Sequence, residues 1–231
     1  MVQTRRIHRR LPDEHRAGGV RRSPRRAAST GTARAGGGLV NAGEAVVIRG
    51  EKVRLVPPSG VDFAKVTGAW VNDPLTRHLI VGPAYQMSLA AREDFLRERL
   101  EPSFKGIYLV IETLDTPEPV AIGGIELRQV SPEHRSADIG ILVGDRAYWG
   151  RGYGTDAMRA LCRFAFDEMD LNRIELHVLE VNTRAVRSYE RVGFVVEGRQ
   201  RQDAYLGGHY YDSLVMGLLR ADFVAAEQAR Q

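Results

Sequence analysis

Three glycines at alternate positions, Gly150, Gly152 and Gly154, stand between a short apolar segment and a helical pattern, and no other feature constrains this chain as much. Glycine loses more conformational entropy on folding than any other residue. Three of them at one turn therefore indicate backbone angles that only glycine tolerates, or a close approach to the main chain. A strand, a glycine-rich turn and a helix start are typical of anion binding, because the first helical N–H groups have no partner.

The spacing of these glycines excludes two well-known phosphate-binding motifs. A P-loop requires Gly-x-x-x-x-Gly-Lys-Ser/Thr, and no lysine follows the glycines here. The dinucleotide motif Gly-x-Gly-x-x-Gly requires a glycine where this chain has Thr155. The turn therefore predicts a phosphate contact of another kind, and the alternative is a tight turn without a ligand.

The surrounding pattern predicts one mixed α/β domain over residues 45–224. Helical spacing follows the glycine turn, and in the helix predicted at 89–101 the apolar residues Leu89, Phe95, Leu96 and Leu100 fall on or near one face. Further helices are predicted at 60–73 and 183–193. Strands are predicted at 45–58 (two short segments around Gly50), 106–115, 119–130, 136–145, 173–181, 194–206 and 209–220, the last two forming a hairpin at 207–208.

The two ends of the chain differ from this domain. Residues 1–44 hold ten arginines, three acidic residues, seven glycines and no aromatic residue, a net charge of +7. Because the whole chain carries +4, the remainder carries −3. This composition predicts a disordered extension; the alternatives are a nucleic-acid-binding arm and an organelle-targeting peptide. Residues 225–231 are interpreted as a C-terminal tail.

Cysteine and histidine usage narrows the classes of site. Cys162 is the only cysteine, which excludes an intrachain disulfide and a zinc site built on cysteine pairs. The histidines at 78, 134, 177 and 209 show no ligand spacing, so we predict no metal. No apolar run approaches the roughly 20 residues of a membrane span. We therefore expect a cytoplasmic protein without a membrane partner.

Two segments resemble the GNAT superfamily of acetyl-CoA-dependent N-acetyltransferases. In "WGRGYGTDAMRAL", Gly152 and Gly154 match the small residues of the family signature Gln/Arg-x-x-Gly-x-Gly/Ala, whereas Trp149 replaces its Gln/Arg. "VNTRAVRSYERVGF" matches the second family pattern at Asn182, Ala185, Tyr189, Gly193 and Phe194. "NDPLTRHL" and "REDFLRERL" resemble the branch of ribosomal-protein alanine and spermidine N-acetyltransferases. The resemblance covers residues 47–220.

This resemblance implies a fold and a co-substrate site. The fold would be a mostly antiparallel sheet of six to seven strands, splayed between its fourth and fifth strands (137–144 and 173–181) and flanked by about four helices. Gly140 and Gly144 would permit close approach to the central strand, or merely mark a bulge. Acetyl-CoA would contact the diphosphate-binding residues Trp149, Gly150, Arg151, Gly152, Tyr153, Gly154 and Thr155, and its pantetheine arm would pair with Ile141, Leu142 and Val143 and meet Asn182 and Ala185.

Catalytic roles follow from the same resemblance. Tyr189 would be the acid that protonates the leaving thiolate, and the alternative is a core tyrosine. The oxyanion donor would be a backbone N–H near Leu142. The base that accepts the amine proton would be Glu126 or Asp138, directly or through water, although both are equally readable as surface carboxylates. Asn182 would cap the helix at 183–193, bind pantetheine, or both.

The predicted function is acyl transfer to a primary amine, either a protein N-terminus, a polyamine or another small amine. One alternative is a non-catalytic acyl-CoA-binding module whose basic tail binds nucleic acid; another is a different donor such as succinyl-CoA. Residues 70–88 and 201–211 are the predicted acceptor loops, where Asp203 and Asp212, with Glu126, would attract a cation. The branch resemblance also allows a homodimer.

Overall fold

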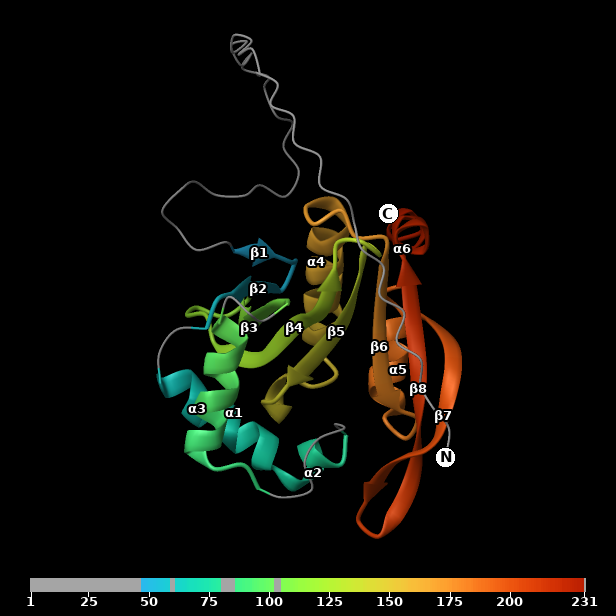
Figure 1. Ribbon diagram of the computed structural model, residues 1–231. Coiled ribbons are helices and arrows are strands. Elements are labelled where there is room, and N and C mark those ends of the chain that lie inside the picture. Colours follow the sequence, from blue (N-terminus) through green and yellow to red (C-terminus); the bar gives the residue numbers. More distant parts are fainter. Residues whose placement is uncertain (1–46, 59–60, 80–85, 102–104, 231) are drawn as a thin grey trace, which may run out of the picture. The chain divides into compact units, whose positions relative to one another are not determined.

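The computed structural model describes residues 47–58, 61–79, 86–101 and 105–230, and the predicted extension at 1–44 lies outside them. The described residues form one eight-stranded sheet in the order β1-β2-β3-β4-β5-β6-β8-β7 (Figure 1). All neighbouring strands are antiparallel except β5 and β6. The strands are β1 Ile48–Arg49, β2 Val53–Val56, β3 Ile107–Thr113, β4 Ala121–Ser131, β5 Ser136–Val143, β6 Arg173–Leu179, β7 Val195–Leu206 and β8 His209–Leu219.

Alternation along the strands divides the side chains between two faces of the sheet. On β3, Leu109 and Ile111 join a large core with helix α4 (Tyr153–Asp167). Tyr108 and Val110 point the other way and join a smaller core with α1 (Val61–Asn72) and α3 (Leu89–Leu100). Helix α5 (Thr183–Glu190) packs beside α4. The remaining helices are α2 (Pro74–Arg77) and α6 (Arg220–Gln228).

Asp156 connects the first turn of α4 to the hairpin between β1 and β2. Its buried carboxylate accepts hydrogen bonds from the backbone N–H groups of Glu51 (3.1 Å), Lys52 (2.7 Å) and Val53 (3.1 Å). A Cβ at Gly50 would lie 2.3 Å from the same carboxylate, so only glycine fits there. A single side chain thus fixes the start of α4 against the edge of the sheet.

Several details differ from the sequence predictions. The described residues form eight strands and six α-helices, whereas the family resemblance implied six to seven strands and about four helices. The strand segments read from the sequence already number eight, and the short helix α2 was not predicted. Helix α6 continues to Gln228, so the predicted tail at 225–231 begins inside a helix, which Phe223 anchors against Phe166. In α3 the buried residues are Arg92 and Leu96, whereas Leu89 and Leu100 are exposed.

Other predictions are confirmed. The hairpin between β7 and β8 turns at Gly207 and Gly208, which both have positive φ. Cys162 is buried in α4, together with Met158, Leu161 and Ala165.

None of the helices in the described part of the chain is long and apolar enough to span a membrane.

Candidate active site

Strands β5 and β6 pair over only three residues and then separate. Parallel pairs join Ser136–Asp138 to Arg173–Glu175, whereas β5 continues to Val143 beside β4 and β6 continues to Leu179 beside β8. The separated parts line a cavity of about 740 Å³, a size typical of small-molecule sites. The predicted splay is therefore present; in chain order it lies between the fifth and sixth strands because β1 adds a strand.

The main chain of β5 turns both polar groups of Val143 toward this gap. The carbonyl of Leu142 points at β4, since a Cβ on Gly123 would lie 2.1 Å from it, and Gly144 N–H donates to Ile122 on the same side. In trans peptides the N–H and carbonyl of each bond point in opposite directions. The N–H and carbonyl of Val143 therefore both face the gap, while the groups of Leu142 face β4. The predicted donor near Leu142 is thus Val143 rather than Leu142 itself.

The glycine turn combines unusual backbone angles with close packing. Gly150 and Gly152 have φ values of +74° and +88°, which side chains rarely adopt. A Cβ on Gly154 would lie 3.4 Å from the Val143 side chain, so helix α4 starts directly against β5. No side chain caps this helix at Gly152. Its first N–H groups and the positive end of its dipole are therefore available to an anion.

The indole N–H of Trp149 binds the main chain of β5. Its indole N–H donates to the Val143 carbonyl at 2.6 Å, so this carbonyl has a partner although it faces the gap. The Arg184 guanidinium lies over the indole ring, 3.7 Å from its centroid. Arg184 lines the cavity and Arg151 does not, and the Arg151 carbonyl instead accepts a hydrogen bond from the Lys52 ammonium. Arg184 is therefore a positive side chain of the cavity lining beside the turn, and the sequence analysis did not identify it.

Tyr153 and Thr155 line the cavity, and the hydroxyl group of each forms a hydrogen bond with another side chain. The Tyr153 side chain is buried and donates to the Asp115 carboxylate, and this hydrogen bond raises its pKa. The Thr155 hydroxyl lies 2.6 Å from the Ser188 hydroxyl, which joins the start of α4 to α5.

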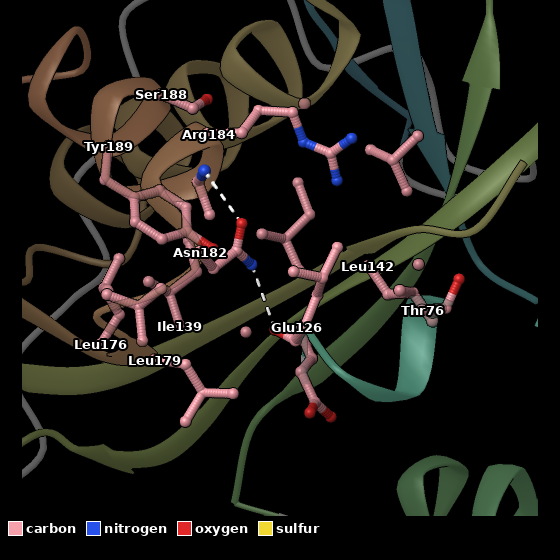
Figure 2. A pocket seen from close by; sticks show the side chains of 18 of the residues that line it. Thr76, Glu126, Ile139, Leu142, Leu176, Leu179, Asn182, Arg184, Ser188 and Tyr189 are labelled. Atoms are coloured by element: carbon pink, nitrogen blue, oxygen red, sulfur yellow. Dashed lines mark hydrogen bonds between the residues drawn. The ribbon is translucent and has the colours of Figure 1, made fainter. Parts of the chain in front are cut away.

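The oxygen and the nitrogen of the Asn182 side chain each form a hydrogen bond with a backbone group (Figure 2). Its side-chain oxygen accepts the Ala185 N–H at 3.2 Å and so caps α5, as predicted. Its side-chain nitrogen donates to the Leu79 carbonyl at 3.1 Å. Both Asn182 and Ala185 line the cavity, and a contact of Asn182 with pantetheine remains a prediction.

Tyr189 lies on α5 and turns its ring toward Asn182 and the cavity (Figure 2). Its ring packs on Phe194, with 6.1 Å between centroids. Burial of the phenol raises the pKa of Tyr189 to about 12. The hydroxyl therefore keeps its proton at neutral pH, as a proton donor must.

Glu126 enters the same cavity from the opposite face of the sheet. It lies on β4 across from Gly140. Its buried carboxylate accepts a hydrogen bond from Arg99 of α3 at 2.8 Å and lies 3.6 Å from the Arg128 guanidinium. Because Tyr189 belongs to the α4 and α5 face, the cavity joins the two faces through the gap.

Asp138 does not line the cavity. It lies where β5 and β6 are still paired, between Arg128 on β4 and Glu175 on β6. Burial raises the pKa of its carboxyl group, and the charge of Arg128 opposes this shift. The structure therefore brings together the candidates Tyr189 and Glu126 and leaves Asp138 at the closed end of the gap.

Gly140 on β5 and Gly144 directly after it each leave room for a different side chain. A Cβ on Gly140 would approach Glu126 to 3.4 Å, so this glycine leaves room for the carboxylate. A Cβ on Gly144 would lie 2.2 Å from the Trp70 ring. Gly144 also begins a bulge, because its N–H and that of Asp145 both donate to the Ile122 carbonyl. The described residues contain no group of three or more His, Cys, Asp or Glu side chains placed to bind a metal.

Comparison with known proteins adds independent information. The sequence profile of the acetyltransferase (GNAT) domain matches residues 52–195. A spermidine N(1)-acetyltransferase of Vibrio cholerae is 31% identical over 45% of this chain, and the aligned residues span 59% of that protein. An uncharacterized N-acetyltransferase of Bacillus subtilis, YoaA, is 30% identical over 69% of this chain and 88% of its own length.

A solved structure agrees with the fold. The crystal structure of spermidine N-acetyltransferase from Vibrio cholerae, in complex with CoA and spermine, superimposes with a TM-score of 0.66 over 74% of this chain and 98% of that chain. The two are 23% identical in sequence, so the likeness concerns the arrangement of the sheet and helices.

Proposed function

The chain belongs to the GNAT acetyltransferase family and is an N-acetyltransferase, and we propose that it transfers the acetyl group of acetyl-CoA to a primary amine, which attacks the thioester directly. The observation that carries the proposal is the cavity that opens between β5 and β6 and receives side chains from both faces of the sheet. Two substrates can thus approach from opposite faces and meet at the gap.

The α4 and α5 face suits the coenzyme. The uncapped start of α4, with Gly150 and Gly152 left open, offers backbone N–H groups to a diphosphate. Arg184 adds a positive side chain beside this turn. The β5 edge near Val143 offers main-chain groups to an extended amide-containing chain, which pairs with it as a strand would.

The reacting groups would meet where the strands part. Acetyl-CoA supplies an acetyl group activated as a thioester. The Val143 N–H would donate to the thioester oxygen as negative charge develops on it. Tyr189 would give its proton to the departing sulfur, and Glu126 would accept a proton from the amine directly or through water. The names of the relatives specify nitrogen as the acetylated atom, in spermidine in one case.

Two measurements test this proposal. Calorimetry with acetyl-CoA tests the coenzyme site, and thiol release in the presence of a panel of primary amines and N-terminal peptides tests turnover. In Gly154→Val the added side chain meets Val143, and we expect acetyl-CoA binding to weaken by about tenfold, the scale of an overpacked contact. Gly198→Ala, on β7 outside the cavity lining, is the matched control. Absence of binding heat with acetyl-CoA in the unmodified protein would refute the proposal.

A further inference from the structure

Three arginines and one glutamate line the cavity on the face that α1 and α3 cover. Arg92 and Arg99 come from α3, and Arg128 and Glu126 come from β4. The two α3 guanidiniums lie against the Phe95 ring, at 4.4 Å and 3.4 Å from its centroid. Among the residues that line this face of the cavity, one carboxylate therefore lies beside three guanidinium groups.

Arg92 is the most unusual member of this group. Its side chain is buried, with a residue exposure of 4%. Its Nε donates to the Thr67 hydroxyl at 2.9 Å and its Nη2 to the Tyr108 hydroxyl at 3.3 Å, so both hydrogen-bond partners are neutral. Burial lowers the pKa of Arg92, since the charged form is removed from water. A buried guanidinium without a bonded carboxylate is costly unless an anion joins it.

Arg128 is also incompletely satisfied. Its Nε is buried without a hydrogen-bond partner among the described residues, since the nearest Glu126 oxygen lies 3.6 Å away. Arg99 already donates to the other oxygen of the same carboxylate. Glu126 therefore cannot neutralise all three arginines. The Arg128 side chain is 42% exposed, so its outer part is accessible from the cavity.

The other acidic residues near this face add no unpaired carboxylate to it: Asp138 lies opposite Arg128 in the sheet but does not line the cavity. Asp212, expected from the sequence to attract a cation, is paired with Arg199 at 3.1 Å and accepts the Gln202 N–H. Asp203 lines the cavity but is exposed on β7. The internal segments that the structure does not describe, 59–60, 80–85 and 102–104, contain no Asp or Glu in their sequence. The predicted role of Asp212 in attracting a cation is therefore not supported.

We infer that the acceptor is an amine that also carries an oxyanion, a carboxylate or a phosphate, which binds Arg92 and Arg128, and that polycationic amines are poor acceptors. This inference rests on the proposed function, because it specifies the second substrate of the same site. Planar guanidinium groups bind both oxyanions through charge-assisted hydrogen bonds. Glu126 then remains beside the amino end of the acceptor, where one negative charge attracts one ammonium group.

The test compares short amines that differ in the group remote from the nitrogen. β-Alanine carries a carboxylate, O-phosphoethanolamine a phosphate, propylamine a methyl group and 1,3-diaminopropane a second cation; spermidine extends the cationic series. We expect kcat/KM in the thiol-release assay to be at least about tenfold higher for the better oxyanion than for propylamine, the effect of one charge-assisted hydrogen bond. Diaminopropane and spermidine should fall below propylamine. The comparison of β-alanine with O-phosphoethanolamine identifies the oxyanion.

Variants connect this preference to the arginines. Arg128→Gln should bring the ratio of oxyanion amine to propylamine close to one, and Arg92→Met should do the same. Because Arg92 is buried, its variant also loses packing, and Arg128→Gln keeps the test valid if Arg92→Met does not fold. The control is Arg97→Gln on the same helix, because Arg97 is exposed, pairs with Asp94 and does not line the cavity.

Calorimetry with β-alanine, O-phosphoethanolamine and 1,3-diaminopropane separates this inference from the proposed function. If the unmodified protein binds an oxyanion amine but releases no thiol, and Arg128→Gln abolishes that binding, the result would support the class of amine and refute acetyl transfer. Thiol release with equal kcat/KM for β-alanine, O-phosphoethanolamine and propylamine, or faster release with spermidine, would refute the acceptor class and leave acetyl transfer standing. Absence of heat with both oxyanion amines, together with turnover of diaminopropane, would also overturn it.

Discussion

Removing the Asp156 carboxylate should destabilise the protein by about 2–5 kcal/mol, and the contacts of this residue determine that range. Asp156→Ala takes the acceptor from three backbone N–H groups. The N–H of Val53 is buried and would stay unsatisfied, which costs about 1–3 kcal/mol. Glu51 and Lys52 are exposed, so water can replace the carboxylate, and each loses roughly 0.5–1 kcal/mol.

Asp156→Asn should cost less, about 1–2 kcal/mol, because its amide oxygen can still accept the Lys52 and Val53 N–H groups. Equilibrium urea unfolding followed by tryptophan fluorescence measures both variants, with Trp149 next to the turn as a reporter. Asp167→Ala, an exposed acid at the other end of α4, is the control and should change stability by less than about 0.5 kcal/mol. If Asp156→Ala unfolds with the free energy of the unmodified protein, the anchoring role assigned to the carboxylate is wrong.

Three further predictions concern the cavity. Tyr189→Phe should lower kcat by about 10²-fold or more with little change in acetyl-CoA affinity. Folding raises the pKa of Tyr189 from 10.0 to about 12, so the phenol stabilises the protein fully below pH 10 and progressively less up to pH 12. Urea unfolding at pH 9 and pH 11 should therefore show a decrease in unfolding free energy that is about 1.4 kcal/mol smaller in the variant than in the unmodified protein. Glu126→Gln should lower kcat and alter the acidic limb of the pH–rate profile, whereas Asp138→Asn, outside the cavity lining, should leave that limb in place; the reverse result would exchange their roles. Gly152→Ala should cost about 1 kcal/mol of stability in a thermal or urea transition because φ is +88° there, and an unchanged midpoint would contradict that strain.

The sequence was sufficient to predict the elements that follow local rules. The glycine spacing, the apolar periodicity of α4 and the Asn182 cap depend on neighbours in the chain, and they appear where the patterns indicate. The open gap followed from the family resemblance, because a strand pattern does not show where pairing stops. Short elements such as α2 were missed because four residues make little more than one helical turn, which is too short to show a repeating pattern.

The composition of the site was harder to predict, because side chains meet there from distant elements. Arg92 looks like a surface residue of a charged helix, and its burial depends on Thr67 and Tyr108, which are 25 and 16 residues away. Arg184 lines the cavity with its guanidinium over the ring of Trp149, which lies on a different element. Asp138 and Glu126 both lie on strand faces in the sequence, and only the register across β4 and β5 separates them.

The early parting of β5 from β6 has a thermodynamic consequence. A sheet that opens in its middle has an internal edge, and an extended ligand that pairs with Val143 would act as a temporary ninth strand. Such a guest would raise the unfolding free energy by about 2.7 kcal/mol at a concentration of 100 times its Kd. Release of coenzyme A after the reaction would then remove this added strand. The unfolding free energy of the protein would fall again at that step of every catalytic cycle.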